Sequence, residues 1–423
     1  MLNLKGKTVF LVILLWALLL SGCGLAGKEQ QQTAERETFA WQSGASSPVP
    51  EERILGYRRG VSRNFILTEN GFYCLKRGKG GCYALYCDLD SDHFVKLCSR
   101  PDCLHNSETC DAYLERISTE LSYYHDKLYY IKYGEPISEI EDGQNIVKYE
   151  PDKLYCMDID GRNKKELTDL TLEEDNFSGN QMLFFSAGYL VDGFLAVGDD
   201  GMIHKQIRYT LLDHPGITVE TPMSRQFPQG QTRIGMNGYF LGQTEDGFIV
   251  MDGLRKIQTE EGELYSLYLW DPDENSLEPL GECKSTVGFF GREEEYLLDG
   301  NRLIRWNYRT HETEVLLDTK LQGSGFAFYP FPDCFVIGET NELKSDELID
   351  SAKLYFYNWN YEKIDECVVP YHKPGQYMVP VFAETKDRIL ITGDSYGSLL
   401  PEYYIEKSDL GTGHITLHEY QYP

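Results

Sequence analysis

The sequence predicts an all-β protein, and three observations support this. The chain has 30 tyrosines and 20 phenylalanines, which favour strands, and 39 glycines, which suit tight turns. Many short runs after residue 54 alternate apolar and polar side chains, as strands with one buried face do. These runs recur in about seven units of roughly 40 to 50 residues, a period typical of a β-propeller, whose four-stranded blades pack radially.

The chain begins with the pattern of an export signal. Lys5 and Lys7 precede an apolar run from Val9 to Leu20, and the small residues Ser21 and Gly22 follow. The run is shorter than the stretch of about 20 apolar residues that a transmembrane helix needs. Residues 1–22 are therefore predicted to be a signal peptide that is removed on export.

Leu20-Ser21-Gly22-Cys23 resembles the lipobox of bacterial lipoproteins. The resemblance implies that Cys23 is acylated on sulfur, becomes the first residue after cleavage and anchors the chain in the membrane through its lipid. We therefore expect an exported protein whose body faces the extracytoplasmic side. The alternatives are an uncleaved anchor and an ordinary signal peptide with a chance cysteine.

Residues 23–52 predict a flexible tether. After Cys23 this segment is mostly polar and small, with two prolines near its end, and has too little apolar surface to fold alone. Residues 53–423 are predicted to form a single β-propeller. The blades are expected near residues 61–98, 121–170, 181–220, 235–282, 286–318, 324–370 and 376–420. The alternative, a pair of β-sandwiches, needs a linker midway, and none is visible in the sequence.

The sequence LYCMDIDGRN at residues 154–163 resembles the strand-and-turn motif of TolB-like and YWTD-like propellers. In those families the Asp-Gly pair, here Asp160 and Gly161, turns the chain between the third and fourth strands of a blade. Residues 269–273 and 303–307 are weaker copies of this motif. The resemblance implies a propeller architecture, and it departs from the WD-repeat pattern, so a WD-type partner platform is not implied.

A cluster of potential metal ligands follows the first predicted blade. Cys98, Cys103, His105 and Cys110 have the spacing C-x4-C-x-H-x4-C, in a loop expected between the first and second blades. Three thiolates and one imidazole suit a tetrahedral structural zinc ion with no open position. Alternation in an extended segment would put Cys103 and His105 on one side, and Pro101 favours a turn.

The spacing also resembles a cysteine loop near the first blade of bacterial propeller lipoproteins, which implies a structural role and no activity. Disulfides are the alternative to zinc, because an exported protein meets oxidising conditions and Cys87 makes the cysteine count even. Free thiols are the third possibility. The sequence does not rank the pairings of four cysteines.

The net charge and the sequence motifs argue against two classes of function. A net charge of −27 at pH 7, made more negative when Lys5 and Lys7 are removed, argues against a nucleic-acid partner. Gly393–Gly397 matches G-x-S-x-G, but a nucleophile elbow needs a helix after the serine, and Pro401 and a strand-like run follow here. No catalytic residue is predicted.

We therefore expect a non-enzymatic module that binds an unidentified protein or glycan through loops at the mouth of the propeller channel. The alternative is a carbohydrate-active enzyme, a glycan lyase or hydrolase, with its site at the same mouth. A purely structural role in an envelope complex is a third hypothesis.

Overall fold

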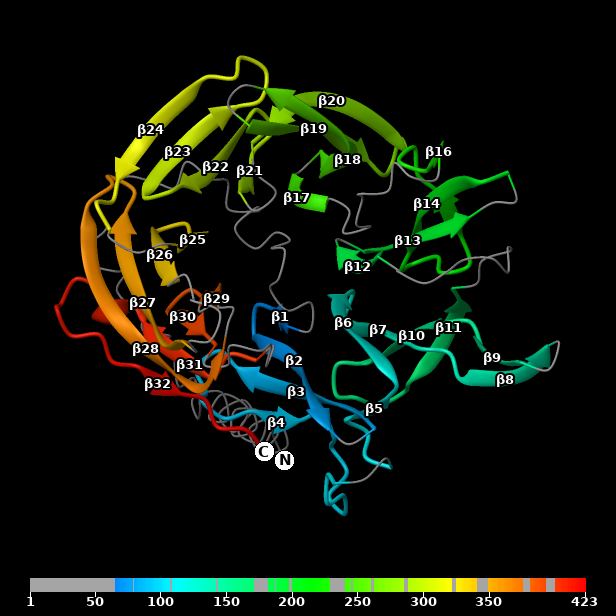
Figure 1. Cartoon of the computed structure of the whole chain (residues 1–423). Coiled ribbons are helices and arrows are strands. Elements are labelled where there is room, and N and C mark those ends of the chain that lie inside the picture. Colours follow the sequence, from blue (N-terminus) through cyan, green and yellow to red (C-terminus); the bar gives the residue numbers. More distant parts are fainter. Residues whose placement is uncertain are drawn as a thin grey trace, which may run out of the picture. The chain divides into compact units, whose positions relative to one another are not determined.

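Consecutive antiparallel strands form seven small sheets arranged in a ring (Figure 1). The computed structural model describes most of the chain after residue 64. The described residues are 65–78, 80–106, 109–141, 144–170, 182–186, 188–197, 200–228, 240–244, 246–259, 262–284, 288–321, 325–340, 349–375, 381–392 and 400–423. The predicted signal peptide, Cys23 and the predicted tether lie outside these residues.

The first three blades carry extra strands. Blade 1 contains β1 (Phe65–Leu67), β2 (Gly71–Gly78), β3 (Gly81–Asp88), β4 (Val95–Lys96) and β5 (Tyr113–Glu115). Blade 2 contains β6 (Ile117–Tyr124), β7 (Lys127–Lys132), β10 (Lys153–Asp158) and β11 (Lys165–Asp169), with the separate hairpin β8 (Pro136–Glu141) and β9 (Gln144–Tyr149) inserted after β7. Blade 3 contains β12 (Met182–Ser186), β13 (Tyr189–Val197), β14 (Met202–Leu211), β15 (Thr218–Glu220) and β16 (Arg225–Pro228).

The other four blades have four strands each. Blade 4 contains β17 (Phe240–Thr244), β18 (Gly247–Thr259), β19 (Gly262–Asp271) and β20 (Ser276–Cys283). Blade 5 contains β21 (Phe289–Phe290), β22 (Glu294–Asp299), β23 (Arg302–Asn307) and β24 (Thr313–Asp318). Blade 6 contains β25 (Gly325–Pro330), β26 (Cys334–Thr340), β27 (Ile349–Asn358) and β28 (Lys363–Gly375). Blade 7 contains β29 (Val381–Glu384), β30 (Arg388–Ile391), β31 (Tyr403–Glu406) and β32 (His418–Glu419).

The predicted all-β, seven-bladed propeller is confirmed. In Figure 1 the first strands, such as β1, β17 and β29, lie nearest the centre, and the last strands, such as β24 and β28, lie outermost. One 3₁₀ turn, η1 (Lys407–Asp409), is the helical element among the described residues. Within the same residues, no helix has the length and apolar character that crossing a membrane requires.

The position predicted for the cysteine loop was wrong in one respect. The loop lies inside blade 1 and not between blades 1 and 2, because β4 and β5 both pair with β3 and together form the outer strand. β5 is only three residues long, which is too short for a strand signal to stand out in the sequence. The loop therefore interrupts the fourth strand of its own blade.

The turn between the third and fourth strands is shaped by the residue that ends the third strand. Asn307 accepts hydrogen bonds from the backbone N–H of Arg309 (3.0 Å) and Thr310 (2.9 Å). Asp271 and Asn358 accept in the same way from the second residue beyond them, at 2.8 and 3.0 Å. A residue at or next to the end of the turn is left-handed in four blades, at Asn163 (φ 53°), Asn275 (47°), His311 (59°) and Tyr361 (65°).

At several boundaries this turn rests on the preceding blade. The Tyr124 hydroxyl of blade 2 donates to Asp213 in the turn of blade 3 (3.1 Å), and the Tyr189 hydroxyl of blade 3 donates to Asp273 in the turn of blade 4 (3.0 Å). A tyrosine suits this position because its ring packs between sheets while its hydroxyl reaches a polar partner. The hydrogen bonds set how one blade is rotated against the next.

The same contact recurs farther round the ring. His311 in the turn of blade 5 lies 2.8 Å from a carboxylate oxygen of Glu282 in blade 4. Gly411 in the turn of blade 7 donates its N–H to Asp365 of blade 6 at 3.1 Å. Different side chains therefore make an equivalent contact at successive boundaries.

The hydrophobic core lies between blades. Phe248 and Trp270 of blade 4 pack against Val191 and Tyr209 of blade 3, and Trp270 is fully buried. Corresponding clusters lie between blades 1 and 2, 2 and 3, 4 and 5, and 7 and 1. Because each sheet is covered on both faces by its neighbours, a blade has little core of its own and depends on the ring.

Blades 7 and 1 close the ring through side chains and the C-terminal residues. Phe94 of blade 1 packs against Tyr420, with ring centroids 5.4 Å apart, and its N–H donates to the carbonyl of Gln421 at 2.8 Å. The Arg388 guanidinium of blade 7 donates to the carbonyl of Ser91 in the turn of blade 1 at 2.7 Å. In the part of the chain that the structure describes, neither of these two blades borrows a strand from the other.

A substitution at Gly161 tests whether these turns are in tight contact with the preceding blade. Its φ is +85°, and a Cβ at this position would lie 2.2 Å from the carbonyl oxygen of Leu97 in blade 1. We predict that Gly161→Ala lowers stability by more than the roughly 1–2 kcal/mol that a left-handed alanine costs by itself. The matched control is Gly201→Ala, where φ is +72° and nothing lies within 4 Å of the added Cβ. Equal losses in thermal or denaturant unfolding would contradict a tight contact between the blades.

Candidate metal centre

The cysteine loop leaves and rejoins blade 1 at a single residue. Ala84 of β3 accepts a hydrogen bond from the N–H of Leu97 at 3.0 Å and donates its own N–H to the carbonyl of Ala112 at 2.8 Å. The segment between these two residues is therefore a closed loop on the outer strand. Cys98 stands just beyond its exit and Cys110 just before its return, so the backbone itself brings these two ends together.

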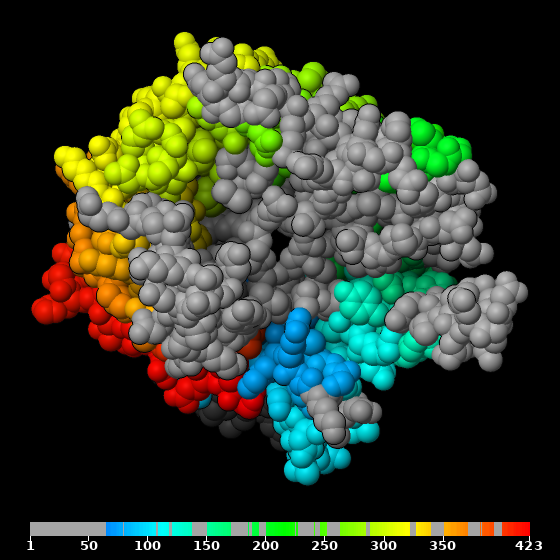
Figure 2. Space-filling view, viewed as in Figure 1, coloured from blue at the N-terminus to red at the C-terminus, as the bar shows by residue number. Residues whose placement is uncertain are grey.

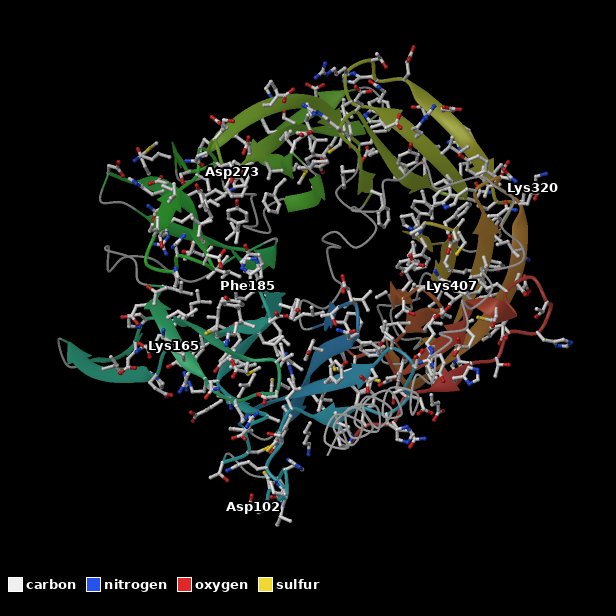
Figure 3. The ribbon with its side chains drawn as sticks, turned by 180° about the vertical axis from the view of Figure 1, so that it is seen from behind. Asp102, Lys165, Phe185, Asp273, Lys320 and Lys407 are labelled. Atoms are coloured by element: carbon white, nitrogen blue, oxygen red, sulfur yellow. The ribbon has the colours of Figure 1, made fainter. Side chains whose placement is uncertain are left out.

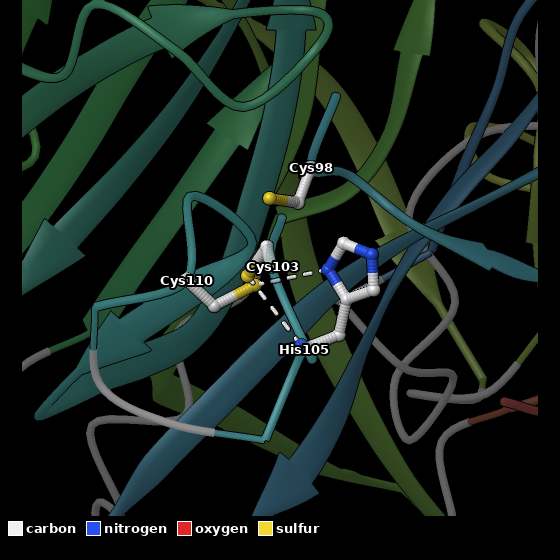
Figure 4. Close-up of side chains that lie close together, drawn as sticks. All are labelled: Cys98, Cys103, His105 and Cys110. Carbon is white, nitrogen blue, oxygen red and sulfur yellow. Dashed lines mark hydrogen bonds between the residues drawn. The ribbon is translucent and has the colours of Figure 1, made fainter. Parts of the chain in front are cut away.

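The structure brings together the four side chains that the sequence singled out as ligands (Figure 4). The Sγ atoms of Cys98, Cys103 and Cys110 and a ring nitrogen of His105 all lie within 4.8 Å of one another. The Cys110 Sγ lies 3.5 Å from His105 Nδ1, and the backbone N–H of His105 donates to Cys103 Sγ at 3.4 Å. Three sulfur atoms and one imidazole nitrogen thus face a common point.

A turn brings Cys103 toward Cys98. The N–H of Cys103 donates to the carbonyl of Arg100 at 3.2 Å, across Pro101. The segment after this turn is not extended as the sequence suggested, because His105 is left-handed with a φ of 53°. Cys103 and His105 still face each other, but through a bend of the backbone and not through strand alternation.

Two cations, Arg100 and Lys96, lie beside the cluster, and no sequence motif indicated them. The Arg100 guanidinium lies 3.6 Å from Cys103 Sγ and 3.4 Å from Asp111, and also donates to the carbonyl of Thr109. Lys96 Nζ donates to the carbonyl of His105 at 2.7 Å. Arg100 lies within the loop and Lys96 just before it, so their closeness in sequence to the cysteines could have indicated these contacts. These charges favour thiolates over thiols.

The thiols differ in their surroundings. Burial raises the pKa of Cys98, but hydrogen bonds from the backbone of Arg100 and Asp111 and from the Arg100 side chain outweigh it and lower that pKa to about 6. Burial is the main cause that raises the pKa of Cys110 to about 11. The pKa is therefore lowered for one of the three sulfurs of the cluster and raised for another.

The arrangement fits a tetrahedral metal ion. With metal–sulfur distances of about 2.3 Å and metal–nitrogen distances of about 2.0 Å, neighbouring ligand atoms lie roughly 3.5 to 3.8 Å apart. The Cys110–His105 distance of 3.5 Å already has this length, and the longest separation allowed by the 4.8 Å limit is about 1 Å greater. Small rotations of side chains would complete the site. The cluster can therefore bind a metal ion.

Cys87 lies elsewhere. It is buried in the core between blades 7 and 1, beside Phe72 and Leu390, where burial raises its pKa to about 12. None of the ten described cysteines forms a disulfide in the structure. Cys87 therefore does not belong to the cluster, which consists of three cysteines and one histidine.

The loop lies at the perimeter of the propeller. Figure 2 shows this part of the first blade, in cyan, at the margin of the described residues. In Figure 3, Asp102 marks the loop on the outer side, away from the strands nearest the centre. The segment Gly393–Gly397 lies outside the described residues, and β31 follows it, as the sequence predicted.

No protein-family model matches the chain, and no curated protein matches it. Solved structures do match. TolB from Acinetobacter baumannii has 12% sequence identity and a TM-score of 0.33, over 72% of this chain and 65% of its own length. A protein from Listeria monocytogenes EGD-e has 11% identity and a TM-score of 0.32, over 86% and 88%. A europium-containing methanol dehydrogenase has 9% identity and a TM-score of 0.37, over 86% and 80%.

The chain spans about two thirds of the TolB chain that it matches. The matched proteins differ in what they do, and dipeptidyl peptidase 4 from Porphyromonas gingivalis also matches, with 10% identity and a TM-score of 0.36, over 83% of this chain and 56% of its own. At such identities and TM-scores, the likeness assigns no activity or ligand to this chain.

Proposed function

We propose that this protein is a membrane-anchored, extracytoplasmic lipoprotein whose β-propeller is a non-enzymatic module that binds a protein or a glycan. The lipobox-like sequence before Cys23 supports the anchor, and the polar segment up to residue 52 supports a tether that holds the body off the lipid. The lipid on Cys23 would be the link to the membrane. A net charge of −27 fits a partner that is not a nucleic acid.

The observation that carries the binding role is the closed ring. Buried apolar clusters lie at five of the boundaries between blades, and turn contacts such as Tyr124–Asp213 add to them. A rigid scaffold of this kind holds many loops in fixed positions, which is how binding sites are commonly built on β folds. The loops at one mouth of the channel are the proposed binding surface.

We further propose that Cys98, Cys103, His105 and Cys110 hold one structural zinc ion. Thiolate and imidazole ligands in a tetrahedral set favour zinc over hard cations such as calcium or magnesium. A disulfide would use two of the three sulfurs and leave the third thiol and the imidazole without a role, whereas a metal ion uses all four groups. With four protein ligands the ion would have no position for a reacting water.

The anchor is tested at Cys23. We predict that the wild-type chain, expressed in a bacterium, incorporates labelled palmitate and sediments with membranes. Cys23→Ser removes the sulfur that accepts the lipid, so the label should disappear. Cys156→Ser, which changes a half-buried cysteine of blade 2, is the matched control and should keep the label. Lipid incorporation that persists in Cys23→Ser would contradict the proposed anchor.

The binding role is tested with glycan and peptide arrays and the full-length chain in detergent. We predict saturable binding to one class of ligand and no chemical change in that ligand, as mass spectrometry would show. Catalytic turnover of a bound glycan, with new reducing ends or unsaturated sugars exceeding the amount of protein, would contradict the non-enzymatic role and favour the lyase or hydrolase.

The metal is tested by elemental analysis of the same preparation. We predict one zinc per chain in the wild type, and loss of zinc with a lower unfolding temperature in Cys110→Ser, because a tetrahedral site binds weakly with three ligands. Cys156→Ser should retain the metal. Wild-type protein without zinc, in which a denatured thiol count shows disulfides, would contradict the proposal.

A further inference from the structure

We propose that blade 2 completes the metal centre of blade 1, so that binding of the metal and docking of the two blades stabilise each other. Lys164 of blade 2 is the positioning residue. This step rests on the zinc proposal above, and it concerns how the site is held and what the metal does for the ring.

Lys164 reaches across the boundary between the blades. It stands at the end of the turn of blade 2, just before β11, and its Nζ donates to the carbonyl of Tyr113 at 2.7 Å. The N–H of Tyr113 in turn donates to the carbonyl of Cys110 at 2.9 Å. Lys164 of blade 2 is thus connected to Cys110, a proposed metal ligand in blade 1, through the backbone of Tyr113.

The turn of blade 2 touches the loop at both of its ends. Gly161 lies against the carbonyl of Leu97, where the loop leaves the sheet, and Lys164 holds Tyr113, where the loop has returned. A metal ion would join the same two ends from within, because Cys98 follows Leu97 and Cys110 precedes the return. The separation of the two loop ends that allows the turn of blade 2 to dock is therefore also the separation that places Cys98 and Cys110 for binding a metal ion.

Charge supports the same coupling. Three thiolates and a neutral imidazole around Zn²⁺ carry a net charge of about −1, and Asp111 adds a further negative charge beside the loop. Arg100 pairs with Asp111 and lies beside Cys103, and Lys164 supplies a second cation from blade 2. Outer partners of this kind orient the ligands and strengthen metal binding.

By linkage, the coupling must act in both directions. If docking of Lys164 strengthens zinc binding, zinc must strengthen the docking of the turn at residues 159–164. The effect is local to one boundary of the ring. The turn of blade 5, at residues 308–311, contacts blade 4 in the same manner without a metal cluster among the described residues beside it.

The test compares two adjacent lysines in the full-length chain in detergent. Lys164→Met removes the cation and its hydrogen bond but leaves all four ligands, and we expect zinc affinity to fall by about tenfold in competition with a chromogenic chelator. Lys165→Met is the matched control, because Lys165 is exposed like Lys164 but lies on β11 opposite Cys156 of β10 (Figure 3), and the zinc affinity of this variant should equal that of the wild type. Lys164→Arg, which keeps a cation, should restore most of the loss.

A second measurement needs no variant. Hydrogen exchange of the wild type, with zinc and after chelation, should show loss of protection at residues 159–164 on metal removal, with residues 308–311 unchanged. Equal zinc affinity of Lys164→Met and Lys165→Met, or unchanged protection at residues 159–164, would overturn the coupling while leaving the zinc site in place. Wild-type protein that binds no zinc would overturn the site itself.

Discussion

The contact between the turn of one blade and the edge of the blade before it holds the structure together. Each sheet is too small to bury its two faces alone, so its apolar side chains pack against both neighbours. Apolar packing by itself permits sliding and rotation. The polar contacts of the turns, such as Tyr189 with Asp273 and Gly411 with Asp365, fix the angle between sheets and leave one arrangement.

The same contact between a turn and the blade before it accounts for how the ring closes, and it bears on the role of the cysteine loop. Blades 7 and 1 meet through Arg388 and Ser91, so the ring closes with the contact used elsewhere and with aromatic packing around Phe94. At the next boundary, the turn of blade 2 rests on an outer strand that is cut in two by the cysteine loop. The metal ion proposed for the four side chains would cross-link the loop and so compensate for that interruption.

Much of the fold follows from the sequence, and the reasons are local. The motif at residues 154–163 and its weaker copies at 269–273 and 303–307 each lie at the end of a third strand, where the chain turns to the fourth, as the resemblance implied. Recurring short runs in which apolar and polar residues alternate predicted the seven blades. The three residues of β5 were too few to show that the loop interrupts a strand, so the loop was placed between blades.

The clustering of the four potential ligands was predictable from spacing, because all four residues lie within one loop that closes at Ala84. Lys164 was not predictable, because it is distant in sequence and approaches only when blade 2 docks. The bend at His105 was missed for a related reason, since a left-handed histidine carries no pattern in sequence. Local chemistry could be predicted here, and contacts between blades could not.

Hydrogen exchange at the backbone amides that bond across blade boundaries tests the account most directly. The amide of Gly411 bonds to Asp365 of blade 6, that of Glu282 bonds to Tyr308 of blade 5, and that of Phe94 bonds to Gln421 of blade 7. If the turns hold the ring as one unit, these amides share one slow rate set by global unfolding. Separate, faster rates at each boundary, with the strands still protected, would show that the blades open independently and would contradict it.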